Sequence, residues 1–238
     1  MSSVLEVKEL ARSFGGISAV DGVTFSVDQA EIVGIIGPNG RGKSTLFNLL
    51  TGVHKADRGH VMLFGQDVTR KPSHKIARAG LSRTFQLPAL FVNMSVRHNL
   101  WAAAVQGDWH GAPSMAEDVL ELLDLADVAE ALAGSLSGGQ QRLLEMGRVL
   151  MQAPRIVLLD EVAAGVHPRL RQTILKAIRE LRAKDTTFLI IEHDLELTQD
   201  ICDRMIVMDA GKIVAEGTFD EITHDPQVME AYLGVPVE

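Results

Sequence analysis

Apolar positions along the chain follow two different periods, one typical of strands and one typical of helices. Strands are predicted where short apolar or alternating runs occur, at residues 4–10, 17–27, 31–36, 61–64, 155–160, 187–192, 205–208 and 213–215. Helices are predicted where the pattern is helical, at residues 43–51, 73–79, 95–105, 140–151 and 169–184. A turn is predicted at Asp21-Gly22 and a loop at residues 107–113.

This order of elements predicts an α/β fold. Strands that alternate with helices form a mainly parallel sheet covered on both faces. The N-terminal runs contain alternating stretches such as residues 23–27, and they predict an antiparallel β-layer. After about residue 114 the pattern becomes helical, so we expect an inserted helical subdomain at about residues 87–152. The length fits one domain over residues 1–238.

The strand at residues 31–36 ends in a glycine-rich turn that carries the first chemical motif. Residues 37–44, GPNGRGKS, match the pattern GxxxxGK[ST], and a predicted helix follows. Glycines let successive backbone N–H groups point at phosphate oxygens, and the helix N-terminus adds its positive dipole end. Lys43 supplies a charge for the β- and γ-phosphates, and the Ser44 hydroxyl can bind Mg²⁺. The motif predicts a P-loop NTPase core.

Two carboxylates, Asp160 and Glu161, follow the apolar run at residues 156–159. In a doubly wound sheet this end of the strand lies beside the phosphate loop. Asp160 can hold the Mg²⁺ shell, and Glu161 can accept a proton from an attacking water. An Asp-Glu pair at the end of a strand is usually just exposed to solvent. The catalytic interpretation of Asp160 and Glu161 therefore depends on the presence of the phosphate loop.

Residues 136–140 read LSGGQ and directly precede a helix. A serine hydroxyl, bare glycine amides and a helix N-terminus form a second anion site. Ser137 lies 23 positions before Asp160. With a phosphate loop upstream, the chain resembles the ATP-binding cassette (ABC) family, whose motif is LSGGQ, from about Leu5 to Gly234. The resemblance implies an ATPase with the ABC ATPase fold.

The resemblance also implies roles for single residues. Phe14 matches the aromatic position that stacks on adenine in the family. Gln86 matches the Q-loop glutamine that contacts Mg²⁺ and water, and His193 matches the histidine that contacts the γ-phosphate. The implied catalytic residues are Glu161, His193 and Gln86, and the implied Mg²⁺ ligands are Ser44, Gln86 and Asp160. The implied ATP contacts are Phe14, Gly37, Pro38, Asn39, Gly40, Arg41, Gly42, Lys43, Ser44, Thr45, Ser137, Gly138, Gly139 and Gln140.

The partners are implied by the same resemblance. In the family two cassettes pack head to tail, so Ser137, Gly138 and Gly139 would act on an ATP held by the other chain. Residues 164–168 match the D-loop, which crosses that interface. Transmembrane permease subunits would bind the cassette pair, a homo- or heterodimer, and a periplasmic substrate-binding protein would act indirectly. This places the chain at the cytoplasmic face of the inner membrane.

Short stretches indicate which member of the family the chain resembles. Residues 83–86, 192–194, 215–218 and 230–234 look like the ATPase subunits of branched-chain amino-acid importers. Urea and amide importers are the runners-up, and a lipid or polysaccharide export ATPase is a further alternative. Arg41, Val162 and His167 depart from the common pattern. A chromosome-maintenance ATPase is disfavoured because no sustained heptads separate the two motifs, and a tandem translation factor because there is one cassette.

Composition and charge exclude some classes of binding partner. The 238 residues include 23 Lys and Arg against 31 Asp and Glu, a net charge of −8. Such a chain lacks the overall basic footprint of nucleic-acid binding, so we expect no nucleic-acid partner. The single Cys202 excludes an intramolecular disulfide and is interpreted, like Trp101, as core, whereas Trp109 is expected to be exposed. No apolar run approaches the ~20 residues that span a bilayer, so membrane association is expected to go through a partner.

Overall fold

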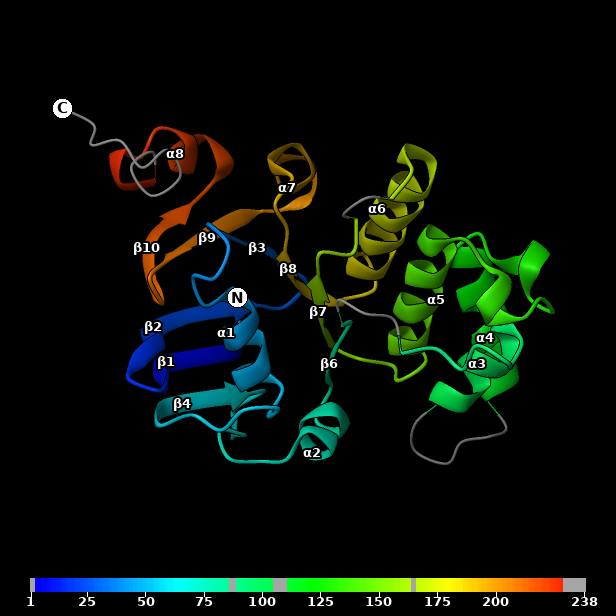
Figure 1. The fold of residues 1–238 in the computed structure, drawn as a ribbon, viewed down its shortest axis with the longest axis horizontal. Coiled ribbons are helices and arrows are strands. Elements are labelled where there is room, and N and C mark those ends of the chain that lie inside the picture. Colours follow the sequence, from blue (N-terminus) through cyan, green and yellow to red (C-terminus); the bar gives the residue numbers. More distant parts are fainter. Residues whose placement is uncertain (1–2, 86–88, 105–110, 164–165, 229–238) are drawn as a thin grey trace.

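An antiparallel sheet is formed by the N-terminal part of the chain. We describe it from a computed structural model, in which residues 3–85, 89–104, 111–163 and 166–228 are described (Figure 1). The strand order in this sheet is β2-β1-β4-β5. The bounds of its strands are β1 Ser3–Phe14, β2 Ile17–Asp28, β4 Arg58–Leu63 and β5 Gln66–Asp67. The antiparallel β-layer predicted from the alternating pattern is therefore present.

The turn between β1 and β2 lies at Gly15-Gly16, so the turn predicted at Asp21-Gly22 is wrong. Asp21 and Gly22 lie inside β2, where the register against β1 shifts between the pairs Leu10↔Val23 and Arg12↔Val20. The extra residue in β2 makes a bulge, and Gly22 there has φ 70°. A bulge and a tight turn both favour glycine at positive φ, so the local sequence signal is the same for both.

A second sheet of six strands forms the centre of the molecule, in the order β10-β9-β3-β8-β7-β6. Its strands are β3 Ile32–Ile36, β6 Leu81–Arg83, β7 Ile156–Asp160, β8 Thr187–Ile191, β9 Arg204–Asp209 and β10 Lys212–Gly217. All neighbours pair in parallel except β10, which is antiparallel to β9. Because β3, β8 and β7 are adjacent and parallel, the loops at their carboxyl ends meet at one edge of the sheet.

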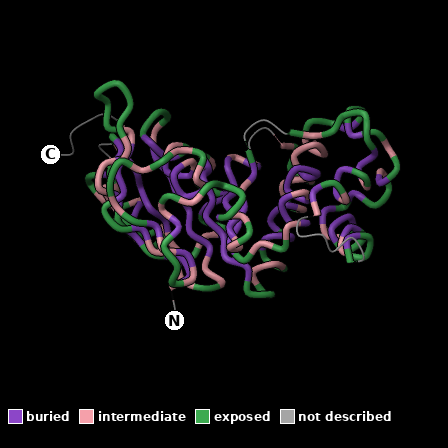
Figure 2. Tube along the Cα trace, turned by 90° about the horizontal axis from the view of Figure 1, so that it is seen from below, coloured by how far each residue is buried: buried purple, intermediate pink, exposed green. Residues whose placement is uncertain are grey.

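Alternate residues of the parallel strands face two separate hydrophobic cores. On one face, Ile35 and Leu158 pack with Phe47 of helix α1 (Lys43–Leu50) and with the antiparallel sheet. On the other face, Val157 and Ile190 pack against the helices α5 (Gly138–Leu150) and α6 (Pro168–Arg182). Figure 2 shows buried residues both in the part of the molecule that holds the sheets and in the part that holds the helices. The sheet is covered on both faces, as a parallel sheet requires.

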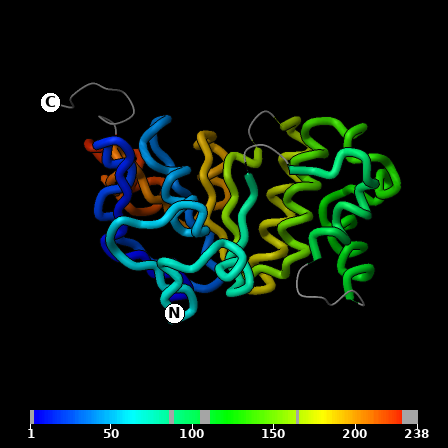
Figure 3. Tube along the Cα trace, turned by 60° about the horizontal axis from the view of Figure 1, so that its bottom comes forward, coloured from blue at the N-terminus to red at the C-terminus, as the bar shows by residue number. Residues whose placement is uncertain are grey.

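The helices α3 (Val96–Ala103) and α4 (Ala112–Leu122) lie with α5 at one end of the molecule (Figures 1 and 3). They approach α5 closely at Gly147, where a Cβ atom would lie 3.0 Å from Leu100 and 3.1 Å from Val119. The loop predicted at residues 107–113 needs a correction, because α4 already begins at Ala112. Pro113 falls in the first turn, where the missing N–H has no partner to lose.

The remaining helices are short. They are α2 (Ser73–Arg78), α7 (Leu195–Ile201), α8 (Phe219–Thr223) and the 3₁₀ turns Ala126–Val128 and Ala133–Ser135. Residues 73–79 were predicted as a helix and form α2, whereas α7 and α8 were not predicted. Across the described parts of the chain, no helix combines the length and apolar character needed to cross a bilayer.

Candidate active site

A cavity of about 370 Å³ lies at the carboxyl ends of the adjacent strands β3, β7 and β8. It is lined by Ala19, Asn39, Gly40, Arg41, Gly42, Lys43, Ser44, Thr45, Glu161 and His193. Residues far apart in the sequence thus meet here: the loop after β3, the carboxylate after β7 and the histidine after β8. The phosphate loop and Asp160-Glu161 were predicted to lie together at this edge, and the family resemblance implied that His193 contacts the γ-phosphate. The structure brings the loop, Glu161 and His193 together.

The shape of the loop after β3 depends on two glycines with positive φ. Gly37 has φ 143°, and a Cβ atom there would lie 2.1 Å from the carbonyl oxygen of Met208. Gly42, which precedes α1, has φ 105°, and its Cβ atom would lie 2.2 Å from the carbonyl oxygen of Ala19. Both positions exclude a side chain for conformational and steric reasons. The chain can therefore wrap tightly enough to turn backbone N–H groups toward one point.

Lys43 places a buried cation under this loop. Its Nζ donates to the carbonyl oxygens of Gly37 at 2.6 Å and Pro38 at 2.9 Å, and the residue is 5% exposed. Burial lowers the pKa of Lys43, whereas the nearby carboxylates Glu161 and Asp160 raise it. Backbone carbonyls satisfy its hydrogen bonds without cancelling its charge. The ammonium group is therefore suited to an anionic ligand in the cavity.

Asp160, the last residue of β7, offers one free acceptor. Its Oδ2 accepts a hydrogen bond from Arg83 at 3.0 Å, in an ion pair whose side chains are 7% and 1% exposed. Its Oδ1 is buried and has no hydrogen-bond partner among the residues described. Burial raises the pKa of Asp160, and the neighbouring Arg83 opposes that shift. An unpartnered carboxylate oxygen fits the needs of Mg²⁺ and its bound water.

Ser44 is the second candidate for Mg²⁺, since it is exposed and lines the cavity. Gln86 lies outside the described residues. Within those residues, no group of three or more His, Cys, Asp or Glu side chains could hold a metal ion. Mg²⁺ characteristically keeps several waters and binds through one or two protein groups plus substrate phosphates. The residues present fit that mode, with Ser44 and Asp160 as the protein groups.

Arg83 is a site residue that the sequence analysis missed. Besides Asp160, its guanidinium donates to Asn48 Oδ1 at 2.7 Å and lies 4.8 Å from the centre of the Phe85 ring. It fixes one oxygen of Asp160 and leaves the other free. The signal was a charged residue three positions before Gln86, but the three-residue strand β6 that carries it was too short to predict.

Glu161 and His193 form a contact at the cavity. The Nε2–H of His193 donates to Glu161 Oε1 at 2.8 Å. Glu161 has φ 52°, which is uncommon for a residue with a side chain, and its own N–H donates to the carbonyl of Ile191 at 2.9 Å. Strained backbone of this kind clusters at functional sites. A carboxylate held at a cavity wall is placed as a general base requires.

Glu192 is a second residue that the sequence analysis passed over. It is 2% exposed, and its Oε1 accepts a hydrogen bond from the backbone N–H of Ala163 at 3.0 Å. Burial raises the pKa of Glu192 to about 7, since desolvation outweighs the stabilising backbone hydrogen bonds. The carboxylate joins the segment after Glu161 to the strand end that carries His193. The available signal was a carboxylate directly after the apolar run at residues 188–191.

The LSGGQ residues lie apart from this cavity, since none of residues 136–140 lines it. Ser137 caps α5: its Oγ accepts from the N–H of Gln140 at 3.3 Å, and Gln140 Oε1 accepts from the N–H of Ser137 at 3.1 Å. A Cβ atom on Gly138 would meet nothing within 4 Å, whereas one on Gly139 would lie 2.5 Å from Leu170. Ser137 and Gly138 are exposed, and the open space beside Gly138 leaves room for a ligand from outside this chain.

Two further predicted contacts lie at the margin. Phe14 is 40% exposed but does not line the cavity; the Arg12 guanidinium lies 4.8 Å from its ring centre, and the His54 ring meets it edge-on at 5.3 Å. Arg41 lines the cavity, half exposed, with Nε 3.2 Å from Asp209 Oδ1. The adenine contact of Phe14 stays a prediction.

Trp101 packs partly buried against the core, and Trp109 lies outside the described residues.

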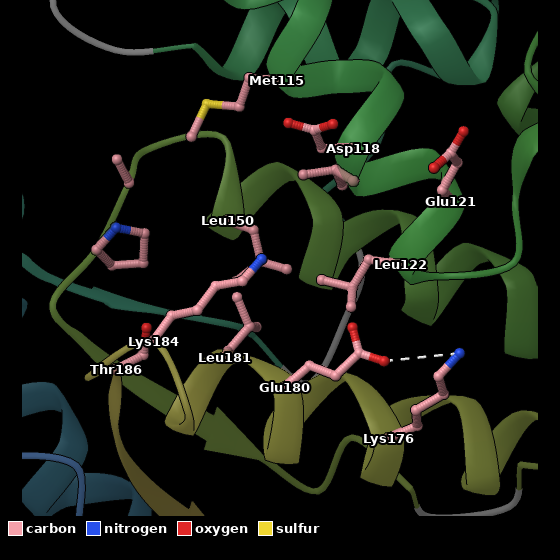
Figure 4. Close-up of a pocket in the computed structure, with 13 residues that line it drawn as sticks. Met115, Asp118, Glu121, Leu122, Leu150, Lys176, Glu180, Leu181, Lys184 and Thr186 are labelled. Carbon is pink, nitrogen blue, oxygen red and sulfur yellow. Dashed lines mark ion pairs between the residues drawn. The ribbon is translucent and has the colours of Figure 1, made fainter.

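A larger hollow of about 660 Å³ lies between α4 and α6 (Figure 4). Met115, Leu122 and Leu181 give it apolar walls. Its charges are mixed: Asp118 and Glu121 lie on α4, and Lys176 pairs with Glu180 at 3.6 Å on α6. None of the motifs of the sequence analysis reaches it. The smaller cavity at the strand ends is therefore the candidate active site.

Comparisons with known proteins agree with this geometry. The model of the family described as ABC transporter matches residues 20–164, which include the phosphate loop, the LSGGQ motif and Asp160-Glu161. The chain belongs to the ABC transporter family. A second model, described as branched-chain amino acid ATP-binding cassette transporter, matches residues 212–238. The resemblance inferred from the motifs is confirmed.

Relatives of this cassette match over nearly the whole length. The high-affinity branched-chain amino acid transport ATP-binding protein LivG of Escherichia coli K12 is 40% identical, covering 97% of this chain and 98% of its own. BraF of Pseudomonas aeruginosa, with the same description, is 39% identical over the same shares. A nucleotide-free ATP-binding cassette from an ABC transporter superposes with a TM-score of 0.89 at 38% identity, covering 98% and 100%. The ABC ATPase fold is confirmed.

The raised pKa of Glu192 predicts how the stability of the cassette depends on pH. Between about pH 4.5 and 7 the folded protein keeps this proton while the unfolded chain has lost it. The free energy of unfolding should therefore fall as pH rises through this window, by about 3 kcal/mol. Glu192→Gln removes the titration and should flatten that part of the profile, measured by urea unfolding at pH 5 and pH 8.

The matched control is Glu196→Gln, which makes the same chemical change at an exposed position on α7. It should keep the wild-type profile. Parallel profiles for wild type and Glu192→Gln would show that the Glu192 carboxylate is not held in a desolvating environment.

Proposed function

We propose that this chain is the ATP-hydrolysing motor subunit of an importer for branched-chain or related amino acids. The observation that carries the ATPase role is the contact between Glu161 and His193 at the rim of the phosphate-loop cavity. The amino-acid substrate is supported by the names of the relatives and by the match at residues 212–238. Residues 1–238 would act as one nucleotide-binding domain, with its helical subdomain at about residues 87–152.

The residues would divide the reaction among them. The amides of residues 39–45 and Lys43 would hold the phosphates, and Mg²⁺ held by Ser44 and Asp160 would neutralise charge on them. Glu161 would take a proton from the attacking water. The Nε2–H of His193, which donates to Glu161 in this structure, is the donor available to the γ-phosphate. Gln86 and Phe14 would add the water and adenine contacts of the family.

The ATP site would be completed by a second cassette. Ser137 and the open face of Gly138 lie outside the cavity of their own chain, and they are exposed. A two-fold pairing places the same two surfaces of each chain opposite each other, so two sites form at once. Ser137, Gly138, Gly139 and Gln140 would then contact the ATP bound by the partner.

A permease would dock on an exposed apolar surface beside α3. Phe91, Val92, Met94 and Leu132 are each between 37% and 54% exposed, and backbone hydrogen bonds join residues 92 and 94 to residues 133 and 134. Exposed apolar groups gathered in this way mark interaction sites. Docking here would hold the cassette at the cytoplasmic face of the inner membrane, with a periplasmic substrate-binding protein acting on the permease from the other side.

Glu161→Gln tests the ATPase role. The amide keeps the shape of the side chain but cannot take a proton, so hydrolysis should fall 10²–10⁴-fold while ATP affinity is kept. Phosphate release and calorimetric ATP binding measure the two effects separately. Turnover within threefold of wild type would remove Glu161 from the role of general base.

Assembly tests the shared site. With Mg²⁺ and ATP, the Glu161→Gln chain should accumulate as a dimer in light scattering after size exclusion, because the γ-phosphate contact persists. ADP should not support the dimer. Adding Ser137→Arg should return the chain to monomer while leaving ATP binding intact, since the new bulk lies at the surface facing the partner. A persistent monomer at tens of micromolar would mean that the partner is a different cassette.

The transported substrate is tested in the complete transporter. With its permease in vesicles and the binding protein present, leucine, isoleucine or valine should stimulate ATP hydrolysis and accumulate in the lumen. Urea and short amides serve as the comparison, because they are the runner-up substrates. Stimulation by urea alone would replace the amino-acid assignment and leave the ATPase role intact.

A further inference from the structure

Positive charge is concentrated in one part of this acidic chain. Residues 68–107 contain six of the 23 Lys and Arg residues, and all 31 Asp and Glu residues lie elsewhere. The six are Arg70, Lys71, Lys75, Arg78, Arg83 and Arg97. Arg83 and Arg97 are accounted for, since they pair with Asp160 and with Glu117 and Glu130. The other four lie in or just before α2, and three of them are exposed.

The fold adds a fifth cation to these four. Lys55, in the turn after α1, lies across a hollow of about 630 Å³ from the segment that leads into α2. The hollow is lined by Gly52, His54, Lys55, Thr69, Arg70, Lys71, Pro72, Ser73 and His74, with no carboxylate among them. Lys75 and Arg78 continue the charge along α2, at the lower edge of Figure 1. We call Lys55, Arg70, Lys71, Lys75 and Arg78 the basic surface.

None of these five cations forms an ion pair within the described part of the chain, although Arg12, Arg58 and Arg204 pair with carboxylates nearby or across the fold. The acidic side chains nearest in sequence are Asp57 and Asp67, and both are engaged elsewhere. Asp57 accepts from Arg12 and from the N–H of Ser13, and Asp67 is engaged by His60 and by Thr69. Lys75 and Arg78 lie in the last turn of α2, where they favour the helix dipole. The helix dipole does not explain Lys55, Arg70 or Lys71, because these residues lie outside α2.

We propose that the basic surface binds the headgroups of anionic phospholipids. Clusters of four to eight Lys and Arg residues bind anionic membrane surfaces, and each residue strengthens partitioning about fivefold. The net charge of −8 does not prevent this, because screening limits repulsion to about 8 Å at physiological salt. A chain of this length has a radius of gyration of roughly 18 Å, so most of its carboxylates lie beyond that range when this surface meets the bilayer.

A lipid surface fits the layout better than an acidic protein segment does. The charges are spread over the turn after α1, the link into α2 and α2 itself, and no residue that lines the hollow has a large apolar side chain. The exposed Phe91, Val92 and Met94 lie in the same acid-free stretch. Their assignment to the permease rests on the proposed function, and it would bring the basic surface to the membrane. The charge argument itself is independent of that function.

Vesicle sedimentation of the purified full chain tests the proposal. Wild type should bind vesicles of phosphatidylcholine with one-third phosphatidylglycerol and ignore pure phosphatidylcholine, and high salt should release it. Lys75→Glu with Arg78→Glu should weaken binding at least tenfold. The matched control is Lys176→Glu with Lys184→Glu, the same charge change at exposed positions in and just after α6, beside the hollow of Figure 4, and it should bind like wild type. ATP affinity confirms that each variant is folded.

Equal binding to neutral and anionic vesicles would overturn the proposal, as would equal losses in the two double variants. If wild type ignores both kinds of vesicle and Lys75→Glu with Arg78→Glu instead loses the permease on co-purification, the surface serves an acidic protein segment and the lipid assignment is wrong. None of these outcomes bears on the ATPase role, which is measured without a membrane.

Discussion

Three ionisable groups are buried where adjacent parallel strands end, and the architecture of the active site depends on how each is satisfied. Lys43 follows β3, Asp160 ends β7 and Glu192 follows β8. Burying a charge is costly unless hydrogen bonds or a counter-ion compensate. Here the compensation is local: backbone carbonyls for Lys43, Arg83 for Asp160, and a backbone N–H of the neighbouring loop for Glu192. The Asp160 and Glu192 contacts join neighbouring segments at the strand ends, and the Lys43 contacts close the phosphate loop on itself.

The backbone of Glu161 is also held by contacts with neighbouring segments. A left-handed conformation costs a non-glycine residue free energy, and surrounding contacts must hold it. The N–H of Glu161 is bound by Ile191, and its carbonyl accepts from Arg142 of α5. The side chain is thereby aimed at His193 rather than away from the cavity. The helix that begins with the LSGGQ motif thus also holds Glu161 of its own chain; under the proposed function, this contact would give one physical link between the two ATP sites of a cassette pair.

The sequence was a good guide where function depends on contiguous residues. The phosphate loop, Asp160-Glu161 and LSGGQ could be predicted because each requires neighbouring residues in a fixed order. Arg83 and Glu192 could not, because their importance comes from partners 77 and 29 positions away. The same limit explains the errors in the fold: Asp21-Gly22 satisfies a bulge as well as a turn, and Pro113 is compatible with a loop or a first helical turn.

Charge has two separate uses in this molecule, and each is recognised by what surrounds it. Some cations form ion pairs with carboxylates inside the fold: Arg83 pairs with Asp160, and Arg204 pairs with Glu31 and Glu216. A paired cation contributes to geometry and little to the outside field. The cations of the basic surface have no such partners among the residues that the structure describes, so their field extends into solvent until salt screens it. In an acidic protein, the position of the unpaired minority therefore carries more information about binding than the net charge does.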